Sequence, residues 1–539
     1  MNILSDLKMY GRFAWGLRGF LRHPITLEEA KAIVQRRMAE REENFLRLVR
    51  KGIFGYPKSP YLPLLKLAQC EMGDIENMIR SRGLEKTLLA LRKAGVYVAF
   101  EEFKGREPIV RNGKVIPVEA HDFDNPYLSH YYKGETGGST GPGTRVSIDL
   151  DHLAAQTPNV MVSYDALKLF DIPFALWFGV PPDPTALSPI LIRARFGHVA
   201  RKWFSPMRIQ DEVVSLKDRF AIQYFVFVGW LNGIPIPRPE FVSLDQPAPI
   251  VHWISETLQT HGACLLIANV SKALRVCIAA LEQGLDLSGN IFLTGGEPHT
   301  SGKVQQITRT GAQCVPTYFF TETGFVGMSC ARPADCNDIH LFKDILALIQ
   351  HPRQLPDMGV SVDAFYFTTL LSTVPKIMLN VESDDYGVIE SRSCGCPLER
   401  YGFTDHLRDI HSFRKLTGEG VTLVGSEMVY ILEEVLPNRF GGSPLDYQLS
   451  EEEDEQGLTR LSLIINPKVE IKEEKEVIGV VLEALKRSSV SADLAQAIWR
   501  QAQTIKIKRM EPIWTARGKL MTLHLSQRPE HKVAQEGGK

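Results

Sequence analysis

The chain has no excess of charge: 62 Lys and Arg residues oppose 63 Asp and Glu residues, and the net charge over 539 residues is -1. A general nucleic-acid-binding protein usually carries a basic excess, so this balance argues against that class. Cysteine is scarce, with eight residues in all. A disulfide-rich scaffold is therefore excluded, and we expect reduced thiols in a long chain that shows no signal peptide.

Long apolar runs are missing as well. Phe220–Pro237 carries no charge, but Gln223, Asn232 and two prolines interrupt it, so it predicts a buried strand with its turn and not a membrane span. Residues 1–24 alternate basic residues with aromatic residues and leucines. They fit a helical cap on the protein's own core, which we favour, or an amphipathic helix on a membrane surface. We expect a cytoplasmic protein without a transmembrane segment.

The rest of the sequence has the periodicity of an α/β protein. Thr26 and Glu29 predict a capping box for a helix over 27–50, and an Asn-Gly turn predicts a hairpin within 108–118. Apolar runs alternate with helical patterns, which is typical of parallel strands joined by helices. These runs are 159–163, 264–268, 291–294 and 313–320.

Composition shifts near residue 400. Beyond it the pattern predicts a strand over 458–465, a helix over 472–486 and a strand over 504–509. A separate, smaller α/β domain is therefore expected at the C-terminal end.

The sharpest local signal is a loop rich in glycine and small hydroxyl residues. It runs Thr136-Gly137-Gly138-Ser139-Thr140-Gly141-Pro142-Gly143-Thr144. The backbone N–H groups of such a loop can converge on one point, which suits a phosphate group. No Gly-Lys-Ser/Thr follows, so this is not a Walker loop, and its glycine spacing does not fit a dinucleotide fingerprint. Taken alone, it is equally a surface loop.

Three further segments follow the loop in order: Gly295-Gly296-Glu297-Pro298, Tyr318-Phe319-Phe320-Thr321-Glu322 and Gly518-Lys519. Together they resemble the motifs of the adenylate-forming enzymes, the superfamily of acyl-CoA ligases and adenylating domains. Phe319 stands where that family has a glycine. The stretch after Glu322, with its cysteines, a histidine and Tyr386-Gly-Val-Ile389, resembles the phenylacetate–CoA ligase-like branch. The resemblance covers about residues 60 to 525.

The resemblance implies a fold and a division of the chain. We expect an α/β protein with a large N-terminal adenylate-forming domain of β-sheets and flanking helices, and a small, mobile α/β C-terminal domain. The expected segments are a helical extension over 1–60, the core domain over 61–412, and the small domain with a disordered tail over 413–539.

The resemblance also implies a reaction in two halves. A carboxylate attacks the α-phosphate of ATP to give an acyl-adenylate and pyrophosphate, and a thiol then displaces AMP. The glycine-rich loop would cradle the phosphates, Thr321 would bond the α-phosphate, and Glu322 would hold Mg²⁺, which prefers oxygen ligands. Lys519 would bridge the carboxylate and the α-phosphate when the small domain closes. The competing interpretations are a carboxylate at a helix N-terminus for Glu322 and a solvated lysine for Lys519.

At three positions the sequence departs from the family pattern or can be aligned with it in more than one way. The carboxylate for the ribose hydroxyls would be Asp385, with Asp384 as the alternative. The arginine near the hinge would be Arg414, with Arg408 as the alternative. Arg145 stands near the place where many members have a loop lysine, and it would supply that cation.

A cluster of cysteines with one histidine predicts a metal site. A Cys-x-Cys pair with an upstream cysteine and histidine offers the four ligands of structural Zn²⁺. We favour Cys330, His340, Cys394 and Cys396, with Cys336 as the alternative ligand. Buried thiols without a metal are the competing interpretation.

The substrate is expected to be a small carboxylic acid, apolar or aromatic by analogy with the family. Candidate wall residues, equally compatible with plain core, are Trp177, Phe178, Tyr224, Phe225 and Trp230. Coenzyme A is the acceptor most common in the family, and a carrier-protein thiol is the alternative. A non-catalytic binding module with the same fold is a third interpretation. No nucleic-acid partner is expected, and a homodimer stays open.

Overall fold

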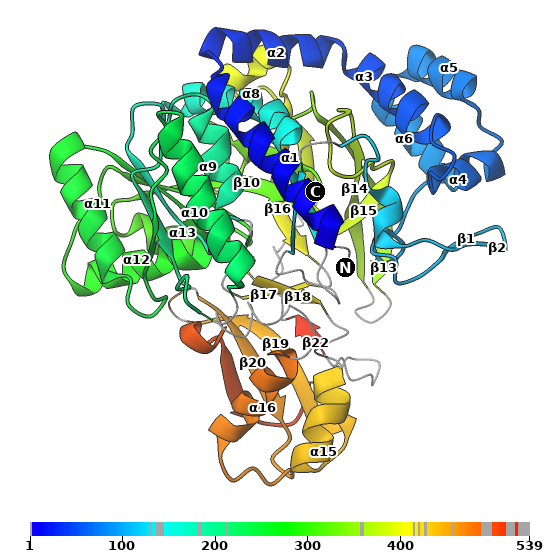
Figure 1. Ribbon diagram of the computed structural model, residues 1–539. Helices are drawn as coiled ribbons and strands as arrows, with labels where there is room; N and C mark the ends of the chain where they lie inside the picture. The colour runs from blue at the N-terminus through cyan, green and yellow to red at the C-terminus, as the bar shows by residue number, and fades with distance from the viewer. Residues whose placement is uncertain are drawn as a thin grey trace, which may run out of the picture.

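The computed structural model describes residues 3–128, 131–135, 145–181, 183, 185–211, 214–355, 360–412, 415–418, 421–424, 428, 430–454, 456, 458–486, 499–513 and 523–525. These residues form a large domain, and below it in Figure 1 a small α/β domain. The α/β class expected from the sequence is confirmed, as are the large N-terminal part built on a sheet with flanking helices and the smaller C-terminal part.

One sheet of 12 strands organises the large domain. Its spatial order is β13 (Leu346–Leu355), β14 (Val360–Thr369), β15 (Val381–Ser391), β16 (Asp405–Ser412), β12 (Ile339–Leu341), β11 (Gly324–Ser329), β10 (Gln313–Phe320), β9 (Asn290–Gly295), β8 (Cys264–Asn269), β5 (Phe174–Trp177), β6 (Lys202–Ser205) and β7 (Pro239–Phe241). Pairing is antiparallel from β13 to β10 and parallel from β10 to β7. The sheet therefore changes from antiparallel to parallel pairing at β10.

The parallel half is covered on both faces, as parallel sheets require. Helices α8 (Leu150–Leu167) and α9 (Leu187–Ala194) lie on one side, and α11 (Ala248–His261), α12 (Val270–Glu282) and α13 (Ser301–Thr308) on the other. Alternate residues of the fully buried β8 enter the two cores: Leu265 belongs to one and Leu266 to the other. The predicted strands at 264–268, 291–294 and 313–320 are confirmed. The run at 159–163 is wrong as a strand, because it lies inside α8.

The N-terminal segment is helical. It comprises α1 (Ile3–Arg22), α2 (Leu27–Ala39), α3 (Arg41–Leu48), α4 (Tyr61–Leu67), α5 (Met72–Arg82), α6 (Leu84–Lys93) and α7 (Phe100–Phe103). The capping box at Thr26 and Glu29 is confirmed, because each residue's side chain accepts a hydrogen bond from the other's backbone N–H. The predicted helix over 27–50 is divided at Glu40. The hairpin forms β1 (Ile109–Arg111) and β2 (Lys114–Ile116).

The uncharged run at 220–237 is not the buried strand that its composition predicted. Most of it belongs to α10 (Leu216–Leu231), which starts at the N-cap Ser215. Ile222, Phe225 and Val228 are buried at helical spacing, whereas other aromatic residues of the helix face outward. Among the described residues, no helix combines the length and apolarity needed to cross a membrane.

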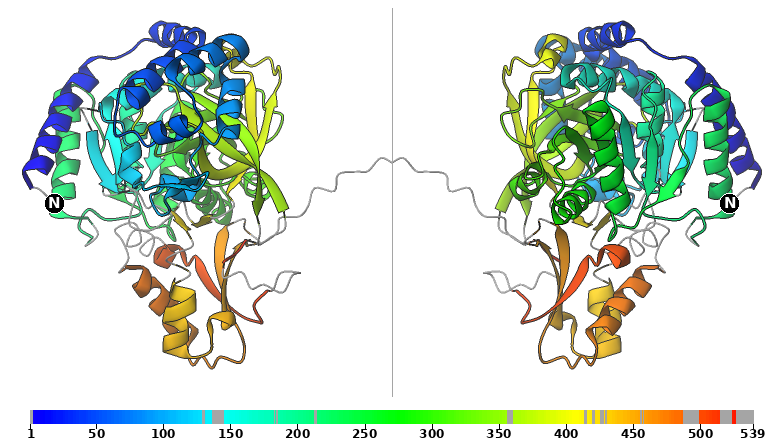
Figure 2. Two further views of the ribbon diagram at one scale, coloured as in Figure 1. Left: turned by 90° about the vertical axis from the view of Figure 1, so that its right-hand side faces the viewer. Right: turned by 90° about the vertical axis from the view of Figure 1, so that its left-hand side faces the viewer.

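The small domain is built on a sheet in the order β21 (Ile505–Arg509), β20 (Thr459–Ile465), β19 (Tyr447–Glu453), β22 (Leu523–Leu525). Helices α15 (Leu436–Phe440) and α16 (Glu474–Lys486) accompany it (Figure 2). The hairpins β3 (Tyr131–Glu135) with β4 (Arg145–Asp149), and β17 (Lys415–Gly418) with β18 (Val421–Val424), complete the strands described. Lys303 of α13 contacts the small domain, donating to Thr459 at 3.0 Å.

Candidate active site

The predicted nucleotide motifs meet where the sheet changes from parallel to antiparallel pairing. Gly295 ends β9, Tyr318 and Phe319 lie near the end of β10, and Thr321 and Glu322 form the turn into β11. Ligands of open α/β sheets bind outside the carboxyl ends of the strands, and these segments follow the carboxyl ends of β9 and β10. The fold thus brings these two motifs, separated by about 20 residues, to one edge of the sheet.

The turn after β9 requires its two glycines. A Cβ on Gly295 would lie 2.5 Å from Thr317 Oγ1, and Gly296 has a φ of +77°. Glu297 is buried, and its Oε2 accepts hydrogen bonds from the backbone N–H of Ser271, at 3.0 Å, and from the Ser271 hydroxyl. The carboxylate therefore holds the turn that ends at Pro298 against the first turn of α12.

Tyr318 and Asp385 also come together, across β10 and β15. The Tyr318 hydroxyl donates to Asp385 Oδ2 at 2.7 Å, and the Ser412 hydroxyl donates to Oδ1. Burial, reinforced by the Asp385 charge, raises the pKa of Tyr318, so the phenol stays a donor. The alternative Asp384 is fully buried with a φ of +69°. The structure thus places Asp385, and not its neighbour, in hydrogen-bond contact with the motif tyrosine.

Glu322 pairs with a residue that the sequence did not nominate. Lys104, at the end of α7, places its Nζ 2.6 Å from Glu322 Oε1. Burial opposes ionisation of Glu322, but the Lys104 charge and hydrogen bond outweigh it and lower the pKa of Glu322 to about 2. The carboxylate is therefore ionised at neutral pH. Lys104 and Glu322 are 218 residues apart, and no local pattern marks the pair.

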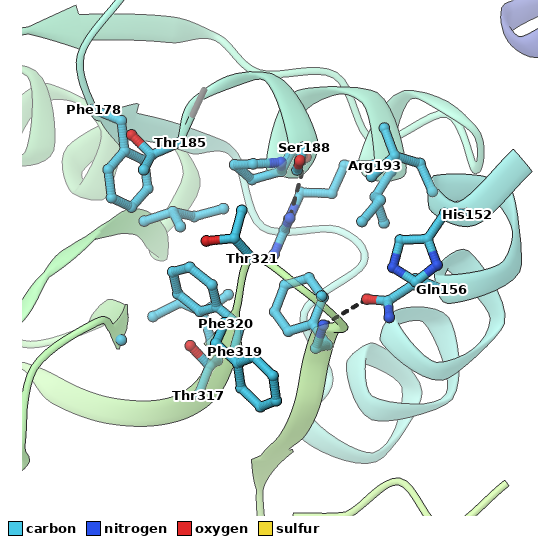
Figure 3. Close-up of a pocket in the computed structure, with 18 of the residues that line it drawn as sticks. His152, Gln156, Phe178, Thr185, Ser188, Arg193, Thr317, Phe319, Phe320 and Thr321 are labelled. Carbon is cyan, nitrogen blue, oxygen red and sulfur yellow. Dashed lines mark hydrogen bonds between the residues drawn. The ribbon is translucent and has the colours of Figure 1, made fainter. Parts of the chain in front are cut away.

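An apolar cavity of about 130 Å³ lies beside this turn (Figure 3). Gly295, Thr317, Phe319 and Thr321 form one wall, and residues of α8 and α9 form the opposite one. Of the five aromatic wall candidates only Phe178 lines it. The other four candidates do not line the cavity, and the sequence could not distinguish them from residues that do. Trp177 and Phe225 belong to the core, whereas Tyr224 and Trp230 are 42% and 65% exposed.

The cysteine and histidine cluster is assembled from β12, the loop after β11 and the loop after β15. One ligand atom each from Cys330, His340, Cys394 and Cys396 lies within 4.8 Å of all the others, and Cys336 is not part of this group. His340 Nδ1 lies 2.7 Å from the Phe403 carbonyl, which only accepts, so Nδ1 carries the proton and Nε2 keeps its lone pair. That orientation is the one that metal-binding histidines usually show.

Several predicted residues lie outside the described residues: the loop Thr136–Thr144, Arg414 and Lys519. Arg145 is the first residue of β4, where its backbone pairs with Glu135. The alternative hinge arginine, Arg408, is on β16 and its Nη2 donates to Glu390 at 2.8 Å.

No protein-family model matches the chain, and no curated protein matches its sequence. Solved structures do match. The 2-hydroxyisobutyryl-CoA ligase in complex with 2-HIB-AMP and CoA in the thioesterification state is similar over 94% of this chain and 91% of its own, at 13% identity and a TM-score of 0.53.

Two looser matches have TM-scores below 0.5. They are an amide bond synthetase from Marinactinospora thermotolerans (10% identity, 94% and 97% of the two chains, TM-score 0.41) and an o-succinylbenzoate CoA synthetase from Bacillus subtilis (12% identity, 81% and 80%, TM-score 0.40). The likeness to the hydroxyisobutyryl-CoA ligase shows that the chain has the fold of the AMP-forming acyl-CoA ligases.

Proposed function

We propose that this protein uses ATP to activate a carboxylic acid as its acyl-adenylate and then transfers the acyl group to a thiol, with coenzyme A as the first candidate. One observation carries the proposal. An apolar cavity opens on Thr321 and Gly295, at the edge of the sheet that also holds Glu322 and the Tyr318–Asp385 pair. A hydrocarbon acid and a charged nucleotide would thus meet at one point.

The roles follow from the chemistry of each side chain. In the proposed site the Gly295–Pro298 turn borders the adenine and Asp385 accepts from the ribose hydroxyls. The Thr321 hydroxyl donates to the α-phosphate as its charge grows. The carboxylate oxygens of Glu322, held ionised, fit the preference of Mg²⁺ for oxygen ligands. When bound, that ion would neutralise charge on the phosphates.

Further roles fall on residues beyond those that the structure describes. Ser139 and Thr140 of the glycine-rich loop would cradle the phosphates with Arg145 nearby, and Arg414 would act near the hinge. Lys519 would arrive by rotation of the small domain, which we place at 413–539, after a core of 61–412 and an N-terminal extension of 1–60.

We also propose a structural zinc ion, held by Cys330, His340, Cys394 and Cys396. Three thiolates with one imidazole are a donor set of structural Zn²⁺ sites. Backbone N–H groups already point at two of the sulfurs: those of Arg332 to Cys330 and of Cys396 to Cys394, both at 3.3 Å. The ion would tie the loop after β11 to the loop after β15. This cysteine and histidine arrangement also supports the phenylacetate–CoA ligase-like branch.

The proposal is tested by pyrophosphate release with ATP and Mg²⁺ across a panel of carboxylic acids, each with and without coenzyme A. We expect release that depends on one class of acid, and a thioester when coenzyme A is present. Glu322→Gln should lower the rate at least 100-fold, whereas the exposed Glu119→Gln should not. Acid-dependent pyrophosphate without thioester would move the acceptor to a carrier-protein thiol. Nucleotide binding with no release for any acid would favour a non-catalytic module.

A further inference from the structure

The wall of the apolar cavity contains a buried cation. Arg193, in the last turn of α9, has no exposed surface and borders the cavity together with Thr321 and His152 (Figure 3). Its Nε donates to the Tyr164 hydroxyl, and its Nη1 to the Pro189 carbonyl at 3.1 Å. Nη2 is buried and has no hydrogen-bond partner among the described residues.

No carboxylate in the described part of the chain balances this charge. The acid on the same wall, Asp149, caps α8 and accepts from the His152 backbone N–H at 3.0 Å, and no ion pair joins it to Arg193. His152 adds no second positive charge, because burial lowers its pKa to about 4 and leaves it neutral at pH 7. Leaving a buried guanidinium unpaired is costly, and such charges in proteins normally have an anionic partner.

We propose that Arg193 binds a second carboxylate of the substrate, so that the acid is a dicarboxylic acid whose hydrocarbon part fills the cavity. This inference rests on the proposed adenylation, in which the other carboxylate reacts beside Thr321. The planar guanidinium suits a carboxylate because it offers donors in a fixed fork. His152 adds an acceptor: its Nε2 lies 3.0 Å from the Thr323 carbonyl, so it carries the proton, and the buried Nδ1 has no partner. A hydroxyl group on the same acid would donate a hydrogen bond to this Nδ1.

The first test compares monocarboxylic acids with dicarboxylic acids of the same carbon skeleton, by kcat/KM for pyrophosphate release. The wild type should prefer the dicarboxylic member at least 100-fold, and Arg193→Met should abolish that preference while still using the monocarboxylic member. Arg201→Met is the matched control, because Arg201 is exposed and does not border the cavity, and it should leave the preference unchanged. Equal use of both acids by the wild type would overturn the inference.

A second readout does not need catalysis. Dicarboxylic acids alone should raise the melting temperature of the wild type and not that of Arg193→Met, while Arg193→Lys should respond weakly. This response without pyrophosphate release would support the binding site and contradict the adenylating function. Pyrophosphate release without any Arg193-dependent change in melting temperature would support the adenylating function and contradict the proposed carboxylate site.

An independent observation concerns the outer face of α10 and α1, which lie side by side at the edge of the molecule (Figure 2). The Tyr224 hydroxyl donates to the Ala14 carbonyl at 3.2 Å. The N-terminal helix is the cap that the sequence predicted, with Leu17, Phe20 and Leu21 buried. The outer face is nevertheless strongly apolar. We call it the aromatic face, made of Trp15, Leu216, Phe220, Phe227, Trp230 and Leu231, all more than half exposed.

The exposed charges of residues 11–22 and 214–232 have one sign. Arg12, Arg18, Arg22 and Lys217 are exposed, and the one acid in residues 11–22 and 214–232, Asp218, is buried. Beside Trp15 a recess of about 590 Å³ is bordered by Arg18, Arg22, His23 and Arg195, with Asp151 as its acid. The Nε of the half-buried Arg195 has no partner among the described residues.

We infer that the aromatic face docks on an anionic membrane surface. Tryptophan and phenylalanine enter the interfacial region of a bilayer, and arginines around them attract anionic headgroups. The basic recess would take a headgroup phosphate. Charge complementarity favours this partner over a second copy of the chain, whose own basic rim would face the same arginines.

Co-sedimentation with vesicles tests this surface. The protein should bind phosphatidylcholine vesicles that contain phosphatidylglycerol, and less with rising salt, but not phosphatidylcholine alone. The double variant Phe220→Ser/Trp230→Ser should bind at least tenfold less, whereas Val115→Ser, 63% exposed on the β1–β2 hairpin, should bind as the wild type does. No binding to either vesicle would overturn the inference, as would a dimer that the double variant makes monomeric in light scattering.

Discussion

The pair between Lys104 and Glu322 allows a quantitative prediction. An unperturbed glutamate has a pKa of 4.5, and that of Glu322 in the folded protein is about 2. At about 1.4 kcal/mol for each pKa unit, the ionised pair contributes about 3 kcal/mol to the free energy of unfolding at pH 7. Because the folded-state pKa is lowered, this contribution is present above pH 4.5 and is lost as the pH falls from 4.5 towards 2.

The perturbation is Lys104→Met, which keeps the length of the side chain and removes its charge. Glu322 stays buried without its cation, so we expect its pKa to rise and the free energy of unfolding at pH 7 to fall by about 3 kcal/mol or more. The gap between variant and wild type should shrink as the pH drops below 4.5. The double variant Lys104→Met/Glu322→Gln should recover part of the lost free energy of unfolding, because neither charge of the pair remains.

The assay is urea unfolding of the wild type, the two single variants and the double variant at pH 7, read as a double-mutant cycle. A coupling energy of about 3 kcal/mol is expected. If Glu322 also holds Mg²⁺, then Mg·ATP should stabilise Lys104→Met more than the wild type, because the ion replaces the missing charge. A coupling below about 1 kcal/mol, or a gap that does not depend on pH, would refute the electrostatic reasoning.

Three further predictions concern separate parts of the site. Gly324→Ala should cost at least about 2 kcal/mol more in unfolding than Gly284→Ala; both glycines have positive φ, but only at Gly324 would a Cβ meet Gln156 Oε1, at 2.4 Å. Elemental analysis of protein never exposed to chelator should find about one zinc per chain and markedly less in Cys396→Ser; a value near zero for the wild type would exclude the metal. Lys519→Ala should abolish adenylate formation and keep nucleotide binding, and a wild-type rate in that variant would contradict its role.

The features that could be predicted from the sequence are those that depend on residues close together in the chain. The Thr26 capping box depends on a spacing of three residues, and the predicted strands at 264–268 and 291–294 are buried on both faces and therefore continuously apolar. The proposed zinc ligands could be predicted because cysteine and histidine are rare enough to stand out, although 54 residues separate His340 from Cys394.

The errors have a physical origin as well. The run at 220–237 is uncharged and therefore predicts a buried strand with its turn, but most of it forms α10, whose apolar residues occupy both faces, and one face is exposed. Composition alone cannot distinguish a buried element from a helix that presents aromatic residues to a partner. Lys104 and Arg193 could not be predicted from the sequence for another reason. A single basic residue has no local sequence pattern, and its role depends on the distant segments that pack beside it.

Two cations, Lys104 and Arg193, divide the site into regions of different chemistry. At Lys104 the protein supplies its own counter-ion, Glu322, so the carboxylate is ionised before any ligand arrives. At Arg193 the described chain supplies none, although the side chain has no exposed surface and Nη2 is buried. A folded chain tolerates the second arrangement only if other interactions offset its cost or a ligand completes it. Since the wall around Arg193 is otherwise mostly apolar, a ligand that completes it must itself be anionic at one end and hydrocarbon along its length. A dicarboxylic acid meets both requirements, with its second carboxylate left for the reaction beside Thr321.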